Sequence, residues 1–216
     1  MTSMNAAQAK EMLLYVANSI IAAKPLLTEV DGAIGDGDHG IGMETGMKKA
    51  RDKLLALTTT DVFIPFQITG KTMLMSMGGA SGVIFGSMFL AGAKGKTPKT
   101  EMDAASLAGL FHEGLLEIQA RGKANVGDKT MVDALFPAVD ALEAYQTDGL
   151  LPALIAAEEA AKKGMENTKQ FEARFGRSKT QSSTIGFQDA GATSVWIIFR
   201  AMKEYVQSIQ FSRKSI

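Results

Sequence analysis

Apolar residues recur at three- and four-residue steps along most of this sequence. Between residues 5 and 23 the spacing is kept by Leu13, Val16, Ala17, Ile20 and Ile21. Such a stripe is typical of a helix that buries one face. Pro25 is expected to end this helix, because its ring removes a backbone donor and disfavours helical geometry in the residue before it. Similar stripes predict helices over about 41–57, 61–77, 81–94, 103–121, 130–146, 150–169 and 190–210.

The sequence contains no convincing alternation of apolar and polar residues, and no hairpin dipeptide lies between two β-branched runs. We therefore predict an all-α fold of about eight helices, each of about 15–20 residues. No linker composition or internal repeat divides the chain, so one domain over residues 1–216 is expected. Two connections are unusual. Residues 31–40 read DGAIGDGDHG, and the stretch from about 169 to 191 is long enough to suggest a functional segment.

Composition narrows the class of protein. Hydrophobic residues make up 46% and charged residues 21%, an ordinary globular balance. The 23 Lys and Arg residues equal the 23 Asp and Glu residues, so no overall positive field exists to bind nucleic acid or an anionic membrane. The absence of cysteine excludes disulfides, thiolate catalysis and Cys-ligated metal sites. No apolar run approaches the roughly 20 residues of a membrane span, and the N-terminus lacks the order of a signal peptide. We expect a cytoplasmic protein.

Three aspartates carry the most specific chemistry. Asp36 and Asp38 are two residues apart, so in an extended loop they point to the same side, and Asp31 lies across a glycine-containing turn. Two carboxylates about 6 Å apart repel each other by roughly 3 kcal/mol at an effective dielectric near 20. Such a group favours a bound cation, and all-oxygen ligands suit Mg²⁺ first, then Ca²⁺ or Mn²⁺.

Glycines surround these carboxylates. Gly35, Gly37 and Gly40 allow backbone angles that other residues avoid and let a phosphate approach closely. The helix predicted to start directly afterwards has free N–H groups and a positive dipole end, which attract anions. The segment therefore predicts a metal–phosphate site. The alternative is an ordinary surface turn in which an aspartate caps the helix.

Three familiar motifs are excluded. The run from Gly35 to Gly40 matches G-x-G-x-x-G, but no strand precedes it and no βαβ unit contains it. The sequence Gly70-Lys71-Thr72 resembles the end of a P-loop, yet Pro65 occupies the position of the first glycine. An EF-hand fails because the next ligand position is Gly40 and no glutamate follows at the twelfth.

Four motifs in order resemble the nucleotide-binding L subunit of bacterial dihydroxyacetone kinase. The same module forms the C-terminal domain of single-chain ATP-dependent dihydroxyacetone kinases. The motifs cover nearly the whole chain. They are Asp31-x-x-Ile34-Gly35-Asp36-Gly37-Asp38-His39-Gly40; Gly78-Gly79-Ala80-Ser81-Gly82; Arg121-Gly122-Lys123-Ala124 with Gly127-Asp128-Lys129-Thr130-Met131; and Gly186-Phe187-Gln188-Asp189-Ala190-Gly191-Ala192-Thr193-Ser194.

The resemblance implies an antiparallel eight-helix barrel with the nucleotide in the loops at one end. Carried over by position, Asp31, Asp36 and Asp38 bind two Mg²⁺ ions that bridge the phosphates. No catalytic side chain beyond the metal–nucleotide site is implied. The residues implied to contact the nucleotide are His39, Gly40, Ile41, Gly42, Ala80, Ser81 and Arg177 at the phosphates, Gly122 and Met131 at the adenine, and Asp189, Ala190 and Gly191 closing the pocket.

The resemblance also implies a phosphotransferase. ADP stays bound as a coenzyme, is recharged to ATP by a phosphohistidine M subunit supplied from phosphoenolpyruvate, and passes phosphate to dihydroxyacetone on a K subunit. A homodimer is expected as well. Two alternatives stay open: a subunit that exchanges free ATP and acts on dihydroxyacetone or another short ketose, and a non-catalytic nucleotide-sensing regulatory module.

Several other residues are expected to be structural. Methionines at helical spacing are interpreted as core residues, and so is Trp196. His112 lies in a helical stripe beside Phe111. His39 is not favoured as a phosphorylated histidine, because no second titrating partner is apparent near it in the sequence.

Overall fold

The computed structural model describes residues 2–181 and 183–214. Within these ranges the chain forms nine α-helices, two short 3₁₀ helices and one two-stranded sheet. The α-helices are α1 (Ala6–Ala22), α2 (Lys24–Gly32), α3 (His39–Leu55), α4 (Ile64–Ser76), α5 (Gly79–Leu90), α6 (Ala104–Gly122), α7 (Val132–Ala144), α8 (Leu150–Asn167) and α9 (Ala190–Lys214). The remaining elements are β1 (Ser3–Asn5), β2 (Glu101–Asp103), η1 (Thr168–Gln170) and η2 (Arg177–Thr180).

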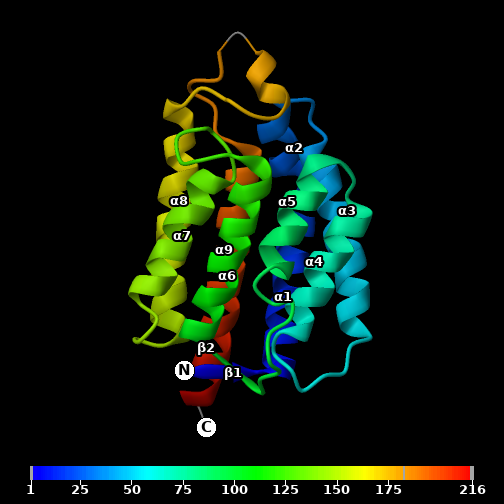
Figure 1. The fold of residues 1–216 in the computed structure, drawn as a ribbon, viewed down its shortest axis with the longest axis vertical. Coiled ribbons are helices and arrows are strands. Elements are labelled where there is room, and N and C mark those ends of the chain that lie inside the picture. Colours follow the sequence, from blue (N-terminus) through cyan, green and yellow to red (C-terminus); the bar gives the residue numbers. More distant parts are fainter. Residues whose placement is uncertain (1, 182, 215–216) are drawn as a thin grey trace.

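The long helices run along the longest axis of the molecule and reverse direction at successive connections (Figure 1). The start of α1 and the end of α9 lie near the strands, and α2 and the connection between α8 and α9 lie at the opposite end (Figure 1). The alternation brings the starts of α3, α5, α7 and α9 to that same end. The all-α prediction is confirmed, since the sheet has only three residues in each strand.

The first predicted helix differs from the prediction at its end. A capping box at Asn5 and Gln8 starts α1. The chain then bends by 52° at Ala23 and continues as α2, with Pro25 in the first turn. Pro25 begins a new helix because the first turn does not need the missing N–H. The prediction that Asp31 lies in a loop was therefore wrong, since Asp31 belongs to the last turn of α2.

The sequence prediction also missed the small sheet. Strands β1 and β2 pair antiparallel, with Met4 opposite Met102, and both side chains are fully buried. Strands of three residues are too short for an alternating pattern to be recognised.

The core is one continuous cluster between the helices. Phe111 of α6 lies at its centre, with ring centroids 6.4 Å from Phe66, 6.2 Å from Phe89 and 5.1 Å from Phe199. These four rings come from four helices and are fully buried. Most methionines fill the core as predicted; the buried ones are Met4, Met12, Met43, Met47, Met73, Met88, Met102, Met131, Met165 and Met202. Trp196 is partly buried and packs against this core, as predicted, and its Nε1 donates to Glu158 at 2.8 Å.

Within the described residues, no single helix is long and apolar enough to cross a membrane, and only α1 and α2 taken together, across their 52° bend, reach such a length and hydropathy.

Small residues set the spacing between neighbouring helices. A Cβ added to Gly164 of α8 would lie 2.0 Å from the Asp133 carbonyl oxygen of α7, and one added to Gly70 of α4 would lie 2.5 Å from the Gly86 carbonyl oxygen of α5. At these contacts the backbones touch, so any larger side chain must push two helices apart.

Gly164→Ala is expected to destabilise the protein by about 3 kcal/mol, because the new methyl group overlaps the α7 backbone. Gly109→Ala, in the middle of α6, is the matched control, since its Cβ meets no atom within 4 Å. There the lower chain entropy should stabilise the protein by about 0.5–1 kcal/mol. Urea denaturation monitored by circular dichroism measures both. Equal effects would contradict the close α7–α8 contact.

Candidate functional site

A cavity of about 800 Å³ opens at the end of the barrel opposite the small sheet. Its walls come from four connections, namely those between α2 and α3, α4 and α5, α6 and α7, and α8 and α9. All the residues predicted for the site line it except Gly40: Asp31, Asp36, Asp38, His39, Ile41, Gly42, Ala80, Ser81, Gly122, Met131, Arg177, Asp189, Ala190 and Gly191. Segments as far apart as α2 and α9 therefore form one site.

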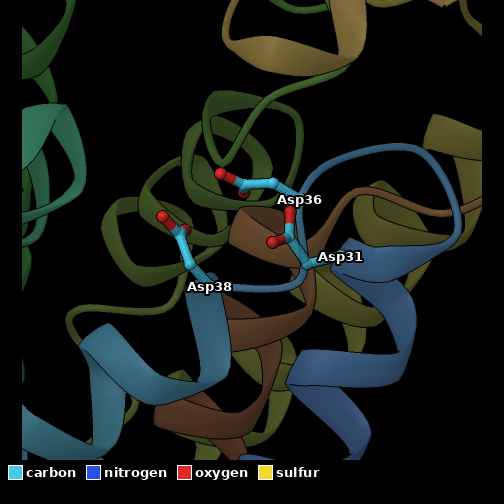
Figure 2. A group of neighbouring side chains, drawn as sticks. All are labelled: Asp31, Asp36 and Asp38. Carbon is cyan, nitrogen blue, oxygen red and sulfur yellow. The ribbon is translucent and has the colours of Figure 1, made fainter.

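The three aspartates gather where α2 passes into α3. Each offers one carboxylate oxygen, and these oxygens lie within 4.8 Å of one another. Figure 2 shows the three side chains around the loop that joins the two helices. Ligand oxygens on opposite sides of one Mg²⁺ are about 4.2 Å apart, given Mg–O distances of 2.0–2.1 Å. The distances between the aspartate oxygens are thus close to those between ligands of one Mg²⁺. A donor set made only of oxygens also fits a hard divalent cation.

Local backbone contacts build this arrangement. The Asp31 carbonyl oxygen accepts the Gly35 N–H at 2.6 Å, and one Asp31 carboxylate oxygen accepts the His39 N–H at 3.2 Å. A Cβ on Gly35 would lie 2.6 Å from the other Asp31 carboxylate oxygen, and Gly37 has a φ of +75°. Both positions require glycine for the loop to close tightly around Asp31.

The side chain of Arg177 lies against the aspartates. Its guanidinium forms an ion pair with Asp36, and a second nitrogen is 3.9 Å from Asp38. Desolvation and the neighbouring carboxylates of Asp36 and Asp31 raise the pKa of Asp38, whereas Arg177 lowers it. The negative charge of the trio therefore draws in a cation from a segment about 140 residues further along the chain, since Arg177 belongs to η2.

Helix starts face the same cavity. Neither Asp38 before α3 nor Gly78 before α5 caps its helix with a side chain. The first turn of α3 lines the cavity through Ile41 and Gly42, and the first turn of α5 lines it through Ala80 and Ser81. Uncapped N–H groups and positive dipole ends favour an anion such as phosphate.

Gly40 is the exception among the predicted residues. A Cβ there would lie 2.3 Å from the Thr28 hydroxyl oxygen and 2.6 Å from the Lys24 carbonyl oxygen. Gly40 thus lets α3 pack directly against α2, and a phosphate contact through its backbone stays a prediction.

An apolar wall completes one side of the cavity. Gly122 ends α6, and a Cβ there meets no atom within 4 Å, whereas Met131 is 5% exposed. Phe85 and Ile118 also line the cavity, and no sequence motif marks them. Both occur in helical stripes, which do not separate a cavity-lining face from the core.

Each histidine side chain contacts a polar side chain of another helix. The Nε2 of His39 is 2.8 Å from the Ser194 hydroxyl oxygen of α9, its ring lies 5.7 Å from Phe85, and burial lowers the pKa of the imidazole. This hydrogen bond holds α3 against α9. His112 lies on the surface, with its Nδ1 2.7 Å from a Glu143 carboxylate oxygen.

Buried polar groups hold the connections that form the site, and one of them, Lys129, also lines the cavity. Asp133 accepts the N–H groups of Gly127 at 2.6 Å and Thr130 at 2.7 Å and so fixes the connection before α7. Lys129 is 2% exposed and donates to two carbonyl oxygens of the α8–α9 connection. Nothing in the sequence indicates that Lys129 is buried, because a lysine between polar loop residues is usually exposed.

Asp189 stands directly before α9 and accepts the Ala192 N–H at 2.7 Å. Desolvation raises the pKa of Asp189 to about 7. The neighbouring Asp133 carboxylate also raises this pKa, whereas the hydrogen bond from the Ala192 N–H lowers it.

The sequence model of the DAK2 domain family matches residues 33–204. The chain belongs to the DAK2 domain family. This assignment confirms the resemblance seen in the sequence motifs.

Several relatives share most of the chain. It is 38% identical over 179 residues to the PEP-dependent dihydroxyacetone kinase ADP-binding subunit DhaL of Escherichia coli, covering 82% of this chain and 85% of that subunit. It is 33% identical over 216 residues to the triokinase/FMN cyclase of Rattus norvegicus, covering 96% of this chain but 37% of that enzyme.

Solved structures share the fold. The dihydroxyacetone kinase of C. freundii in complex with AMP-PNP and Mg²⁺ superposes with a TM-score of 0.71 at 27% identity. The superposition covers 94% of this DAK2 chain and 34% of the kinase chain, so the chain spans about a third of that protein. The native form of the same kinase gives a TM-score of 0.73.

Asp36→Asn tests the metal site. The substitution removes one ligand and one negative charge, so the affinity for Mn²⁺ alone should fall at least about tenfold, or about 1.4 kcal/mol. Isothermal titration calorimetry measures this change. Asp140→Asn, at an exposed position of α7, should bind Mn²⁺ like the unchanged protein, and both variants should keep their helical circular dichroism. Unaltered binding by Asp36→Asn would exclude the site.

Asp189→Asn tests the raised pKa. Between pH 4 and 7 the folded chain binds a proton at Asp189 that the unfolded chain releases, so stability falls as pH rises through this window. Asparagine keeps the oxygen that caps α9 and removes the titration. The stability of the variant relative to the unchanged protein should therefore increase from pH 4 to 7 and then level off. The total is at most about 4 kcal/mol, at about 1.4 kcal/mol per pKa unit. Urea denaturation in EDTA across this pH range measures it, and a pH-independent difference would contradict the assignment.

Proposed function

We propose that this chain is a single nucleotide-binding domain over residues 1–216. It carries Mg²⁺-bound ADP or ATP in the cavity and serves as the ADP-binding subunit of a PEP-dependent dihydroxyacetone kinase. The observation that carries the proposal is the convergence of three carboxylates, uncapped helix starts and Arg177 on one cavity of about 800 Å³. Cavities of about 300–1,000 Å³ are typical of small-molecule sites.

Charge balance supports a polyphosphate ligand. Three carboxylates and a diphosphate bring about six negative charges, which two Mg²⁺ ions would largely neutralise. We assign these ions to Asp31, Asp36 and Asp38. Bound there, Mg²⁺ supplies charge stabilisation to the phosphoryl group in transfer. The protein then needs to orient the phosphates and provides no nucleophile of its own.

The chain's own groups perform this orientation. The first turns of α3 and α5 donate backbone N–H groups to phosphate oxygens, from Ile41 and from Ala80 and Ser81. Gly42 contacts the phosphates without its N–H, which donates to the Asp38 carbonyl oxygen at 3.0 Å. With the trio neutralised by metal, the guanidinium of Arg177 would be free of Asp36 and could bind phosphate oxygens. The apolar wall beside Gly122 and Met131 accepts the adenine.

Partners follow from the relatives. The E. coli relative is named as a subunit of a PEP-dependent kinase, so we propose a K subunit that carries dihydroxyacetone and an M subunit that donates phosphate from a phosphohistidine. Exposed apolar side chains near the cavity, including Ile41 at 52% exposure, are suitable for such docking. The expected homodimer stays a prediction.

A second candidate keeps the site but exchanges free ATP. The kinase of C. freundii was solved with AMP-PNP and Mg²⁺, and this chain has the same fold. Both functions use one pocket, and they differ in whether the nucleotide leaves after each turnover.

The purified protein distinguishes these functions. Gel filtration followed by absorbance and mass measurement should find about one ADP retained per chain in Mg²⁺, and none after EDTA. An empty pocket that exchanges ATP rapidly would favour the second candidate.

Reconstitution tests the reaction itself. With K and M subunits, phosphoenolpyruvate and the general phosphotransferase proteins, dihydroxyacetone should be phosphorylated without added ATP, and Asp36→Asn should be inactive. Retained ADP with no transfer under any of these conditions would favour a nucleotide-sensing regulatory module.

A further inference from the structure

The chain between α8 and α9 leaves the barrel and returns to it at a narrow neck. The neck comprises residues 168–173 on the way out and 184–189 on the way back. The Gly186 N–H donates to the Lys169 carbonyl oxygen at 2.7 Å. Further out, a Glu172 carboxylate oxygen accepts both the N–H and the hydroxyl of Thr184, each at 2.8 Å. Beyond the neck lie residues 174–181, the Arg177 segment, which brings its guanidinium to the aspartates.

The side chain of Lys129 inserts into the base of this neck. Its Nζ donates to the Thr168 carbonyl oxygen at 2.7 Å in the outgoing segment of the neck, residues 168–173. It also donates to the Phe187 carbonyl oxygen in the returning segment, residues 184–189. The Thr168 hydroxyl also accepts the Asp189 N–H at 2.9 Å. One ammonium group thus joins the end of α8 to the residues directly before α9.

The residue before Lys129 holds the outer part of the same excursion. The Asp128 carbonyl oxygen accepts the Arg174 N–H at 3.2 Å, and the Asp128 carboxylate lies 3.4 Å from the Arg174 guanidinium. The α6–α7 connection therefore contacts the neck at its base and at the start of the Arg177 segment.

Burying the charged side chain of a lysine costs free energy that a purely structural contact does not require. Burial lowers the pKa of Lys129, although the carboxylates of Asp189, Glu172 and Asp133 act to raise it. The residue also has a φ of +58°, which is uncommon outside glycine. Its two hydrogen bonds are made to main-chain oxygens of the excursion, so the position of the charge fixes the position of that backbone.

We propose that Lys129 is a positioning residue for the nucleotide site: it fixes the neck and thereby holds Arg177 over the aspartate trio and Asp189 at the start of α9. The inference rests on the proposed nucleotide site. Lys129 itself binds no phosphate in this account and acts through Arg177.

A double-mutant cycle tests this coupling. Lys129→Met should weaken Mg²⁺–ADP binding about tenfold, equivalent to about 1.4 kcal/mol. In an Arg177→Met background the same substitution should have an effect of less than about twofold, because the residue through which it acts is already absent. Lys169→Met is the matched control, since this exposed lysine lies in the same neck and contributes only its backbone.

Metal binding gives a second signature. Lys129→Met should not reduce the affinity for Mn²⁺ alone, because the trio is built from the α2–α3 connection. A general loss of structure would lower both affinities. A tenfold loss of ADP binding that persists in the Arg177→Met background, or a parallel loss of Mn²⁺ binding, would overturn the proposal.

Hydrogen exchange on the ligand-free protein separates this inference from the proposed function. Amides of residues 171–181 and 183–187 should exchange faster in Lys129→Met than in Lys169→Met, whether or not the protein binds nucleotide. Equal exchange would overturn the inference, whereas failure of the unchanged protein to bind Mg²⁺–ADP would overturn the function. If Lys129→Met does not fold, Lys129→Gln, which keeps one donor, should give the same changes with smaller amplitude.

Discussion

Mutual repulsion within the aspartate trio governs this end of the molecule. Carboxylate oxygens within 4.8 Å of one another are stable together only when positive charge is close. The fold provides that charge from two sources, the uncapped first turns of α3 and α5 and the guanidinium of Arg177. In the proposed function a divalent ion would be the third source, and its double charge would leave a positive surplus for a polyphosphate.

The barrel supplies these charges through its topology. Because successive long helices reverse direction, α3, α5, α7 and α9 all start at one end, and their dipoles add there. Close backbone contacts at Gly164 and Gly70 keep the helices near enough for their connections to meet around one cavity. The small sheet closes the other end, far from the chemistry (Figure 1).

Around the cavity, buried polar groups determine where the connections lie. Asp133 fixes the connection before α7, Lys129 fixes the neck before α9, and His39 joins α3 to α9 through Ser194. Each of these bonds links segments that the apolar core does not order by itself. Because a binding site must hold its contacting groups to within about 0.5 Å, such supports matter as much as the residues that touch a ligand.

The sequence by itself determined the helical class, most helix ranges, the acidic loop and, through four ordered motifs, the family. Local patterns suffice for these properties, since helical periodicity and glycine-bounded loops depend only on residues close together in the sequence. Only the tertiary structure decided that Pro25 begins α2, that two three-residue strands pair across the chain, and that Gly40 serves helix packing. It also decided that Lys129 is buried at the neck. These features depend on contacts between residues up to about a hundred positions apart, which no local pattern encodes, because a lysine or a glycine has the same sequence signature whether it faces water, a neighbouring helix or a cavity.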